Sequence, residues 1–156
     1  MKLRKYFDLL DREWVASWLN TPQVCEAFCG LSRVTNRMFE EWYDADDQLQ
    51  WILENEEREP VAYGEIWTDP DSTDVELAHL LVSTEFRHQG VGRQLVQALV
   101  EQVRKDFPQV KRVLLRVDPE LTHALQFARK TEFQELKEIP EDWIDEYVWF
   151  VYNLDS

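Results

Sequence analysis

Two residue types that shape turns and cross-links are scarce in this sequence, which has four glycines and two cysteines in 156 residues. Two cysteines exclude a disulfide-rich scaffold. No run of apolar residues approaches the roughly 18 that a membrane span needs, and the first residues lack the apolar segment of a signal peptide. We therefore expect a cytoplasmic protein that does not associate with membranes.

Basic residues are also in short supply, because 17 lysines and arginines stand against 31 aspartates and glutamates, for a net charge of −14. A surface of this charge repels nucleic acid, which we do not expect as a partner. Hydrophobic residues make up 44% of the chain, enough for one substantial core. We expect a single domain that spans residues 1–156.

The scarce positive charge is concentrated between Arg87 and Arg116, where seven basic residues accompany only Glu101 and Asp106 as acidic ones. One interpretation is a local site for an anion. The other is a solvated helix end, because Arg104 and its basic neighbours would favour the negative end of a helix dipole. Charge alone leaves the two interpretations open.

The two cysteines, Cys25 and Cys29, are four residues apart in a segment with helical character. A disulfide between them would break the helix, and no other Cys or His is close enough in sequence to complete a zinc site. We therefore expect free thiols and no bound metal.

Hydrophobic periodicity and turn signals predict an alternation of strands and helices. Strands are expected at residues 2–7, 48–55, 60–69, 75–82, 111–117, 133–139 and 146–154. Helices are expected at residues 11–19, 21–29, 90–107 and 118–130, with a further helical piece within 36–47. Trp14 and Trp18 share the apolar face of the first helix, Thr21 and Gly30 begin and end the second, and Asp118 is the expected cap of the last. The apolar residues at helical spacing in the helix at 90–107 are Leu95, Val96, Leu99, Val100 and Val103. The main order, β-α-α-β-β-β-α-β-α-β-β, predicts an α/β (α+β) fold with a mixed, mostly antiparallel central sheet and flanking helices.

Half of the glycines stand in one short segment, RHQGVGR at residues 87–93, between a strand that ends at Val82 and a helix that begins near Gly90. The first amides of a helix have no partner within it, and together with the helix dipole they form an anion site. Without Cβ atoms, Gly90 and Gly92 let a bulky anion approach the main chain closely. The arginines at both ends of the segment add positive charge, and its histidine adds a hydrogen-bond donor.

The spacing of these glycines excludes two common phosphate-binding loops. It does not fit the Walker pattern, and Leu95 stands where the dinucleotide pattern requires glycine. The motif therefore predicts a phosphate-bearing ligand of another kind. The alternative is that the two glycines only shape the turn between strand and helix.

The segment LLVSTEFRHQGVGRQLVQALV resembles the acyl-coenzyme A motif of the GNAT N-acetyltransferases, which is Arg or Gln, two variable residues, Gly, any residue, and Gly or Ala. Arg87, Gly90 and Gly92 fit this pattern. The resemblance extends over about residues 60–152 and implies the GNAT fold, with splayed central strands and an acyl-coenzyme A-binding core at about 75–133. It also implies acetyl-CoA as co-substrate, without a metal.

The resemblance further implies a role for each part of this core. Main-chain amides of the glycine segment should hold the coenzyme's pyrophosphate, and the end of the preceding strand should pair with the pantetheine arm. The implied coenzyme-binding residues are Leu80, Leu81 and Val82 for the arm, and Arg87, His88, Gln89, Gly90, Val91, Gly92 and Arg93 for the pyrophosphate.

In the activity that the resemblance implies, a primary amine attacks the thioester directly, and a base near the splayed strand takes its proton. The candidates are Glu76 and His79, which strand alternation places on opposite faces, His79 together with Leu81. The alternative for Glu76 is a solvent-facing carboxylate. For His79, the alternative is a hydrogen-bonded core histidine.

The general acid of the family pattern is absent from this sequence. Aligning ALQFARKTEF places Ala128 at the usual Tyr, Leu121 at the usual Asn, and Glu132 at the usual Gly of a helix end. Alanine donates no proton. The alternative function is therefore a non-catalytic module that binds acyl-coenzyme A. A third, of a different class, is an acidic interaction domain in which the glycine turn is only structural.

The amine acceptor would meet the N-terminal helices and nearby turns, where acidic residues alternate with Trp and Tyr in residues 23–30, 40–47 and 67–74. Such a surface suits a small cationic molecule or a basic peptide, through charge and cation–π contacts. The alternative is that these aromatic residues serve packing and these aspartates serve turns. A homodimer is compatible with the sequence.

Overall fold

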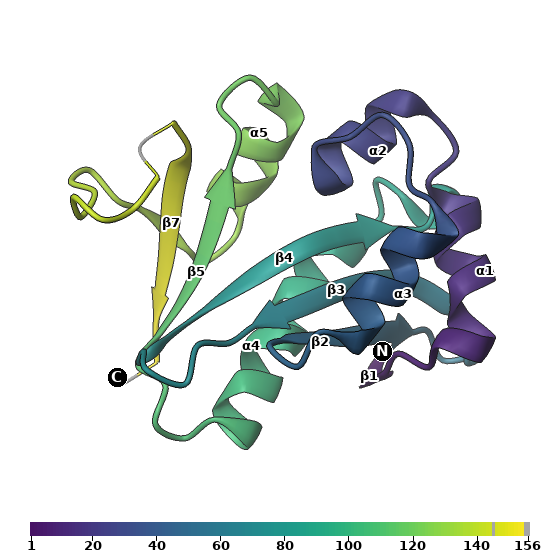
Figure 1. The fold of residues 1–156 in the computed structure, drawn as a ribbon, viewed down its shortest axis with the longest axis horizontal. Helices are drawn as coiled ribbons and strands as arrows, with labels where there is room; N and C mark the ends of the chain where they lie inside the picture. Colours follow the sequence, from purple (N-terminus) through teal and green to yellow (C-terminus); the bar gives the residue numbers. More distant parts are fainter. Residues whose placement is uncertain (145, 155–156) are drawn as a thin grey trace.

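A seven-stranded sheet forms the centre of the protein, which a computed structural model describes for residues 1–144 and 146–154 (Figure 1). The strand order is β1-β2-β3-β4-β5-β7-β6. All neighbours are antiparallel except β4 and β5, which are parallel. The strands are β1 (Lys2–Lys5), β2 (Gln48–Glu54), β3 (Pro60–Trp67), β4 (Asp74–Val82), β5 (Arg112–Val117), β6 (Gln134–Glu135) and β7 (Val148–Asn153).

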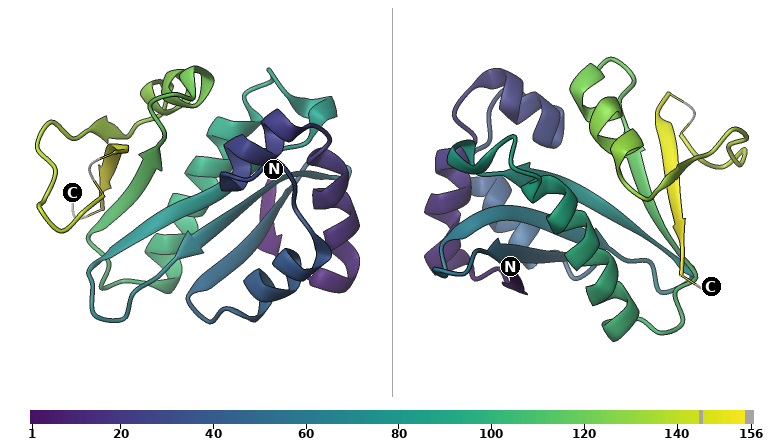
Figure 2. Two further views of the ribbon diagram at one scale, coloured as in Figure 1. Left: turned by 45° about the horizontal axis from the view of Figure 1, so that its top comes forward. Right: turned by 180° about the vertical axis from the view of Figure 1, so that it is seen from behind.

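Helices cover both faces of the sheet, so the architecture is the predicted mixed sheet with flanking helices (Figures 1 and 2). One apolar cluster joins the sheet to the two late helices, and a second joins it to the three early ones. The helices are α1 (Asp8–Trp18), α2 (Pro22–Cys29), α3 (Asn36–Asp44), α4 (Val91–Asp106) and α5 (Thr122–Lys130), with a 3₁₀ turn η1 (Thr84–Phe86).

The helix signals of the sequence are confirmed at two places. Thr21 caps α2 by accepting from the Val24 amide at 3.1 Å, and Gly30 ends it at φ 82°. In α4, every apolar position at helical spacing is buried, in agreement with its predicted face. These positions are Leu95, Val96, Leu99, Val100 and Val103.

Other boundaries differ from the predictions. The piece within 36–47 is a full helix, α3, whose start is capped by Thr35. Helix α5 begins at Thr122, because the predicted cap Asp118 instead closes a turn by accepting from the Leu121 amide at 3.0 Å. In α1, Trp14 was predicted on the buried face but is 52% exposed, and the burial comes from Val15 and Trp18.

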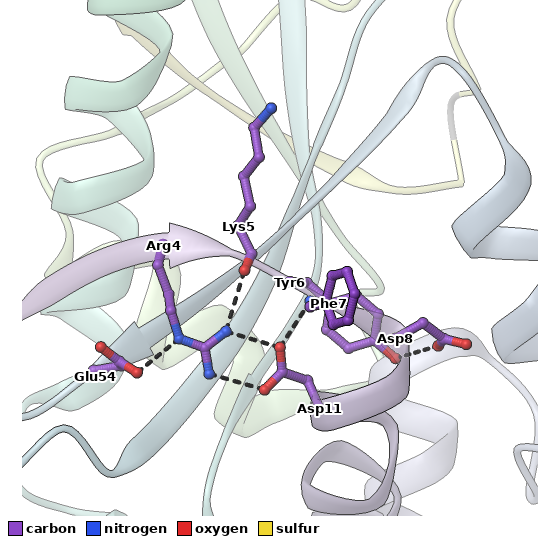
Figure 3. A network of polar contacts seen from close by, with 7 residues as sticks. All are labelled: Arg4, Lys5, Tyr6, Phe7, Asp8, Asp11 and Glu54. Atoms are coloured by element: carbon purple, nitrogen blue, oxygen red, sulfur yellow. Dashed lines mark hydrogen bonds and ion pairs between the residues drawn. The ribbon is translucent and has the colours of Figure 1, made fainter.

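Helix α1 is tied to the edge of the sheet by a polar network around Arg4 (Figure 3). Its guanidinium donates to both carboxylate oxygens of Asp11 at 2.8 Å and to Glu54 at 2.7 Å. Asp11 is 1% exposed and also accepts from the Phe7 amide at 2.8 Å. Strand β1, strand β2 and helix α1 are thus joined through one side chain.

Within the part of the chain that the structure describes, none of the helices combines the length and the apolar character needed to span a bilayer. The two cysteines are free thiols, as predicted, with Cys25 buried and Cys29 half-buried. Burial raises the pKa of the Cys29 thiol above its ordinary value.

Candidate functional site

Strands β4 and β5 separate along their length, which opens the sheet near its middle (Figures 1 and 2). They are paired from Asp74, opposite Arg112, only as far as Glu76, opposite Leu114. Strand β4 nevertheless continues to Val82 and β5 to Val117. The splayed central strands that the resemblance implied are present.

The separation leaves main-chain groups of β4 directed toward the opening. The Ser83 amide donates to the carbonyl of Val61 in β3 at 2.8 Å. Because antiparallel strands alternate, the N–H and C=O of Val82 then point to the opposite edge, away from β3. At this edge, Arg87 Nε donates to the Val82 carbonyl at 3.4 Å. Leu81 pairs with Tyr63 of β3.

The segment between β4 and α4 has the backbone geometry of an anion site. His88 and Gly90 both adopt left-handed conformations, at φ 63° and 79°. Gly90 is the N-cap of α4, whose start has no side-chain cap and no acidic residue in its first turn. The amides of residues 91–93 therefore have no partner within the helix, and left-handed turns of this kind present successive N–H groups to an anion. The segment from His88 to Gly90 is exposed.

The two glycines of this segment serve different needs. Gly90 requires its left-handed φ, and a Cβ there would meet no atom within 4 Å. Gly92 has no such φ, but a Cβ there would lie 2.9 Å from the ring of Phe127 in α5. The missing Cβ of Gly92 thus allows α4 and α5 to pack closely, a role that the sequence analysis did not assign to it.

The basic residues between Arg87 and Arg116 do not gather at one site in the structure. Arg112 forms a two-point ion pair with Asp74, and Arg116 forms one with Glu76. These contacts raise the pKa of both guanidinium groups above their ordinary value. Arg104, near the end of α4, donates to main chain and side chain of the last strand region. In contrast, no ion pair within the described residues engages the arginines of the glycine segment.

A β-bulge interrupts β4 at His79, which has φ 49°. The pairing shifts from Tyr63 opposite Leu81 to Glu65 opposite Ala78. A bulge inserts one residue and changes which side chains face which side of the sheet. The prediction from simple alternation that Glu76 and His79 lie on opposite faces was wrong for this reason, whereas His79 and Leu81 do share a face.

The bulge places both base candidates on the face covered by the early helices. Leu80 and Val82 pack instead in the cluster with α4, as Val75 and Leu77 do. Glu76 is not solvent-facing, because its two oxygens each lie 2.7 Å from a nitrogen of Arg116 and its side chain is 14% exposed.

His79 is hydrogen-bonded to a buried carboxylate that the sequence analysis did not single out. Its Nδ1 lies 2.8 Å from Oε2 of Glu65, which is fully buried in β3. Glu65 also accepts from the Tyr63 hydroxyl at 2.5 Å and from Trp67 Nε1 at 2.8 Å. Burial and the neighbouring Glu65 raise the pKa of Tyr63 well above its ordinary value, so this phenol keeps its proton.

Aromatic rings enclose the His79 imidazole on several sides. Phe28 of α2 stacks on it at a centroid distance of 4.8 Å, and Trp42 of α3 lies at 4.8 Å. Trp67 of β3 meets it edge to face at 5.3 Å. The side chain of His79 retains 12% exposure. Three segments that the sequence analysis assigned to the acceptor side, 23–30, 40–47 and 67–74, thus each contribute one ring around this histidine.

The residues that stand at the usual Tyr, Asn and Gly of the family pattern occupy structural positions. Ala128 is fully buried, and Leu121 is the N-cap of α5. Glu132 was expected to cap the helix end, but Thr131 does so, with its hydroxyl donating to the carbonyl of Ala128 at 2.6 Å. Tyr152 accepts a hydrogen bond from Arg104 at 3.3 Å.

The described residues contain no group of three or more His, Cys, Asp or Glu side chains arranged to hold a metal ion. The candidate site has three parts. They are the free amides at the start of α4, the open edge of β4, and His79 with its hydrogen bond to the buried Glu65. Glu65 has a sequence signal, since an acidic residue inside an otherwise apolar strand must have a partner when it is buried.

Comparison with known proteins identifies relatives of this arrangement. The family model for the acetyltransferase (GNAT) family matches residues 5–133, which begins well before the resemblance seen in the sequence. No curated protein sequence matches the chain.

Solved structures share the fold over almost the whole chain. Aminoglycoside acetyltransferase AAC(6')-Ib in complex with coenzyme A is 21% identical, with a TM-score of 0.78, over 97% of this chain and 94% of that chain. Spermidine N-acetyltransferase from Vibrio cholerae in complex with CoA and spermine is 14% identical, with a TM-score of 0.77, over 97% and 94%. A domain from Methanocaldococcus jannaschii is 16% identical, with a TM-score of 0.74, over 98% and 97%.

Proposed function

The chain belongs to the GNAT acetyltransferase family, and on this premise we propose that it transfers an acetyl group from acetyl-CoA to a primary amine. The observation that carries the proposal is the opening between β4 and β5 beside a loop of free amides. An unpaired strand edge suited to an extended arm and free amides suited to its phosphates are thus adjacent. Relatives in fold are named as acetyltransferases and were solved with coenzyme A.

The residues present fit the coenzyme. The amides from His88 to Arg93 suit a pyrophosphate, because a helix start and left-handed turns both concentrate N–H groups. Arg87 and Arg93 add charge there. The stretch expected to pair with the pantetheine arm, Leu80 to Val82, lies along this edge; Val82 offers its main-chain groups to it, whereas those of Leu81 face Tyr63 of β3.

For the chemical step, we assign His79 rather than Glu76 as the base. The carboxylate of Glu76 is engaged by Arg116 at both oxygens, whereas His79 uses one ring nitrogen for Glu65. Its Nε2 takes the proton that the attacking amine loses as the N–C bond forms and the C–S bond breaks. The departing thiolate takes a proton from water, a modest demand for a group whose pKa is about 8.5.

We propose a cationic amine as the acceptor. The chain carries a net charge of −14, and three aromatic rings lie beside the proposed base. Aromatic faces attract ammonium groups, and negative charge draws them in. The relatives in fold named above include enzymes for an aminoglycoside and for spermidine, which are cationic amines.

The first experiment is isothermal titration with acetyl-CoA, followed by thiol detection with a panel of amines containing spermidine, an aminoglycoside and a basic peptide. We expect binding and release of free thiol with at least one cationic amine. Arg93→Gln should weaken coenzyme binding by about 5- to 30-fold, the loss expected for one charge-assisted contact to phosphate. Arg129, on the exposed face of α5, gives the control, since Arg129→Gln should leave the affinity unchanged.

A second candidate function is a module that binds acyl-coenzyme A without transfer, which the buried Ala128 at the position of the usual acid favours. The two candidates differ in one outcome. Binding without thiol release for any amine supports the module, and the absence of binding at millimolar acetyl-CoA overturns both.

A further inference from the structure

The partners of Glu65 decide which ring nitrogen of His79 carries the proton. An ionised carboxylate only accepts hydrogen bonds, and two donors besides the His79 ring already reach Glu65. Oε1 accepts from Trp67 Nε1 at 2.8 Å, and Oε2 accepts from Tyr63 at 2.5 Å. The contact of 2.8 Å between Oε2 and His79 Nδ1 therefore requires Nδ1 to be the donor.

The hydroxyl of Tyr63 cannot reverse this arrangement. Gln50 donates from Nε2 to that hydroxyl at 2.7 Å, so the oxygen already accepts and directs its own proton to Glu65. Gln50 is 9% exposed and Tyr63 is fully buried. Water therefore has little access to the chain of hydrogen bonds, and the direction of each donor is fixed.

The opposite ring nitrogen of His79 is the one left for substrate. Within the described residues, no hydrogen bond reaches Nε2, and this atom is not among the fully buried polar atoms without a partner. The 12% exposure of the side chain therefore includes this edge of the ring. When Nδ1 carries the proton of the neutral imidazole, Nε2 carries a lone pair and can accept a proton.

The aromatic rings prevent the imidazole from turning. Phe28 lies nearly parallel to it, with an interplanar angle of 23°, while Trp42 and Trp67 approach from other directions. A ring flip would exchange Nδ1 for a carbon atom opposite Glu65 and leave a buried carboxylate oxygen with one donor fewer. That loss is expensive in a dry site.

We infer that Glu65 is a positioning residue for acyl transfer: from the neighbouring strand, it holds His79 in the tautomer with the proton on Nδ1 and keeps Nε2 free to take the proton of the amine. Glu65 does not touch the substrate, and it acts by orienting the imidazole and by stabilising the imidazolium that forms. This inference rests on the proposed function for its catalytic part only. The tautomer itself is a property of the resting protein.

The test is Glu65→Gln, with two readouts. Long-range ¹⁵N–¹H spectra of the imidazole report the tautomer without any substrate. In the unchanged protein we expect the proton on Nδ1; in E65Q, the new amide can donate to Nδ1, and the proton should move to Nε2. The second readout is turnover with the best amine of the panel. We expect kcat to fall about 100-fold, the upper end of what is typical when a functional histidine loses its hydrogen-bond partner.

Matched variants separate positioning from loss of structure. Tyr63→Phe removes one donor to Glu65 but leaves the contact to His79, so the tautomer should stay and kcat should change less than about threefold. Asp74→Asn removes the carboxylate that forms an ion pair with Arg112 at the start of β4. It should likewise leave the tautomer unchanged and alter kcat by less than about threefold. Should E65Q fail to fold, Glu65→Asp retains an accepting carboxylate, and kcat should follow the tautomer: both are kept if the contact to Nδ1 survives the shorter reach, and both are lost if it does not.

Two results would overturn the inference: a proton on Nε2 in the unchanged protein, or E65Q with unchanged tautomer and turnover. A protein that releases no thiol with any amine contradicts the proposed transfer and the catalytic part of the inference together. In that case the spectra still decide whether Glu65 fixes the tautomer, so the two failures are distinguishable.

Discussion

Glu76 and Arg116 meet across the point where β4 and β5 cease to be paired, with both carboxylate oxygens 2.7 Å from guanidinium nitrogens. The guanidinium also lies 5.1 Å from the ring centre of Trp149 and 5.5 Å from that of Tyr147. The ion pair therefore holds the two strands together where hydrogen bonds between their main chains stop. Its position makes it a determinant of how wide the strands separate.

Replacing Arg116 by Met should destabilise the protein by about 1–3 kcal/mol, because a half-buried carboxylate would lose two charge-assisted hydrogen bonds. Chemical denaturation measures the change. A double-mutant cycle with Glu76→Gln should recover part of the loss, since no buried charge then remains without a partner. Strictly additive effects would contradict the coupling.

Gly92→Ala should destabilise the protein by about 1–2 kcal/mol, although alanine favours helices, because its Cβ would press on the Phe127 ring at 2.9 Å. In a Phe127→Leu background the same change should become neutral or stabilising. Gly90→Ala serves as the control: it should cost about 1 kcal/mol through its left-handed φ in either background. An equal effect of G92A in both backgrounds would show that Phe127 is not the obstacle.

The free energy of unfolding should fall as the pH rises above about 10, the ordinary pKa of tyrosine. The raised pKa of Tyr63 keeps its proton on in the folded state, whereas the unfolded chain loses it, so high pH favours unfolding. The contribution of Tyr63 to this fall in the free energy of unfolding is at most about 1.4 kcal/mol per pH unit. Tyr63→Phe should be less stable at pH 8, and the gap should narrow by pH 11. Parallel curves of unfolding free energy against pH for the unchanged protein and Tyr63→Phe would rule out this role of Tyr63.

Asp11→Asn should destabilise the protein by about 2–3 kcal/mol, because Asp11 is buried and accepts from both Arg4 and the Phe7 amide (Figure 3). The loss should be local at first, with faster amide exchange in β1 than in β3. Asp8→Asn is a useful comparison from the same turn, since Asp8 bonds Tyr6 and Arg12 rather than strand β1's arginine. Uniform exchange changes across the sheet would contradict a local anchor.

The sequence was sufficient for features whose causes are local. Apolar spacing in α4 and the Thr and Gly signals around α2 predicted these helices, because capping and amphipathic burial depend on neighbours in the chain. The strand that ends at Val82 and the helix that begins near Gly90 followed in the same way. The position of the loop proposed to bind the coenzyme's phosphates was therefore accessible from sequence.

Features that depend on pairing between distant segments were not accessible. The bulge at His79 arises because β4 carries one residue more than β3 requires, which no local pattern of β4 reveals. The ion pairs of Asp74 and Glu76 depend on a parallel strand some 40 residues later, with separations of 38 and 40 residues. Glu65 was missed although Tyr63 and Trp67, two residues before and after it, are local partners on the same strand face; only its contact to His79 depends on the pairing of β3 with β4.

The extra residue in β4 also has a consequence for how the chain can vary. Because Ala78 and His79 face the same side of the sheet, deleting His79 would restore regular alternation and leave Leu80 and Val82 on the side of α4. The hydrophobic packing of the strand end therefore does not depend on the additional residue, and what this residue adds to the strand is the imidazole itself. Natural variation that shortens β4 at this point would keep the sheet and lose the proposed base.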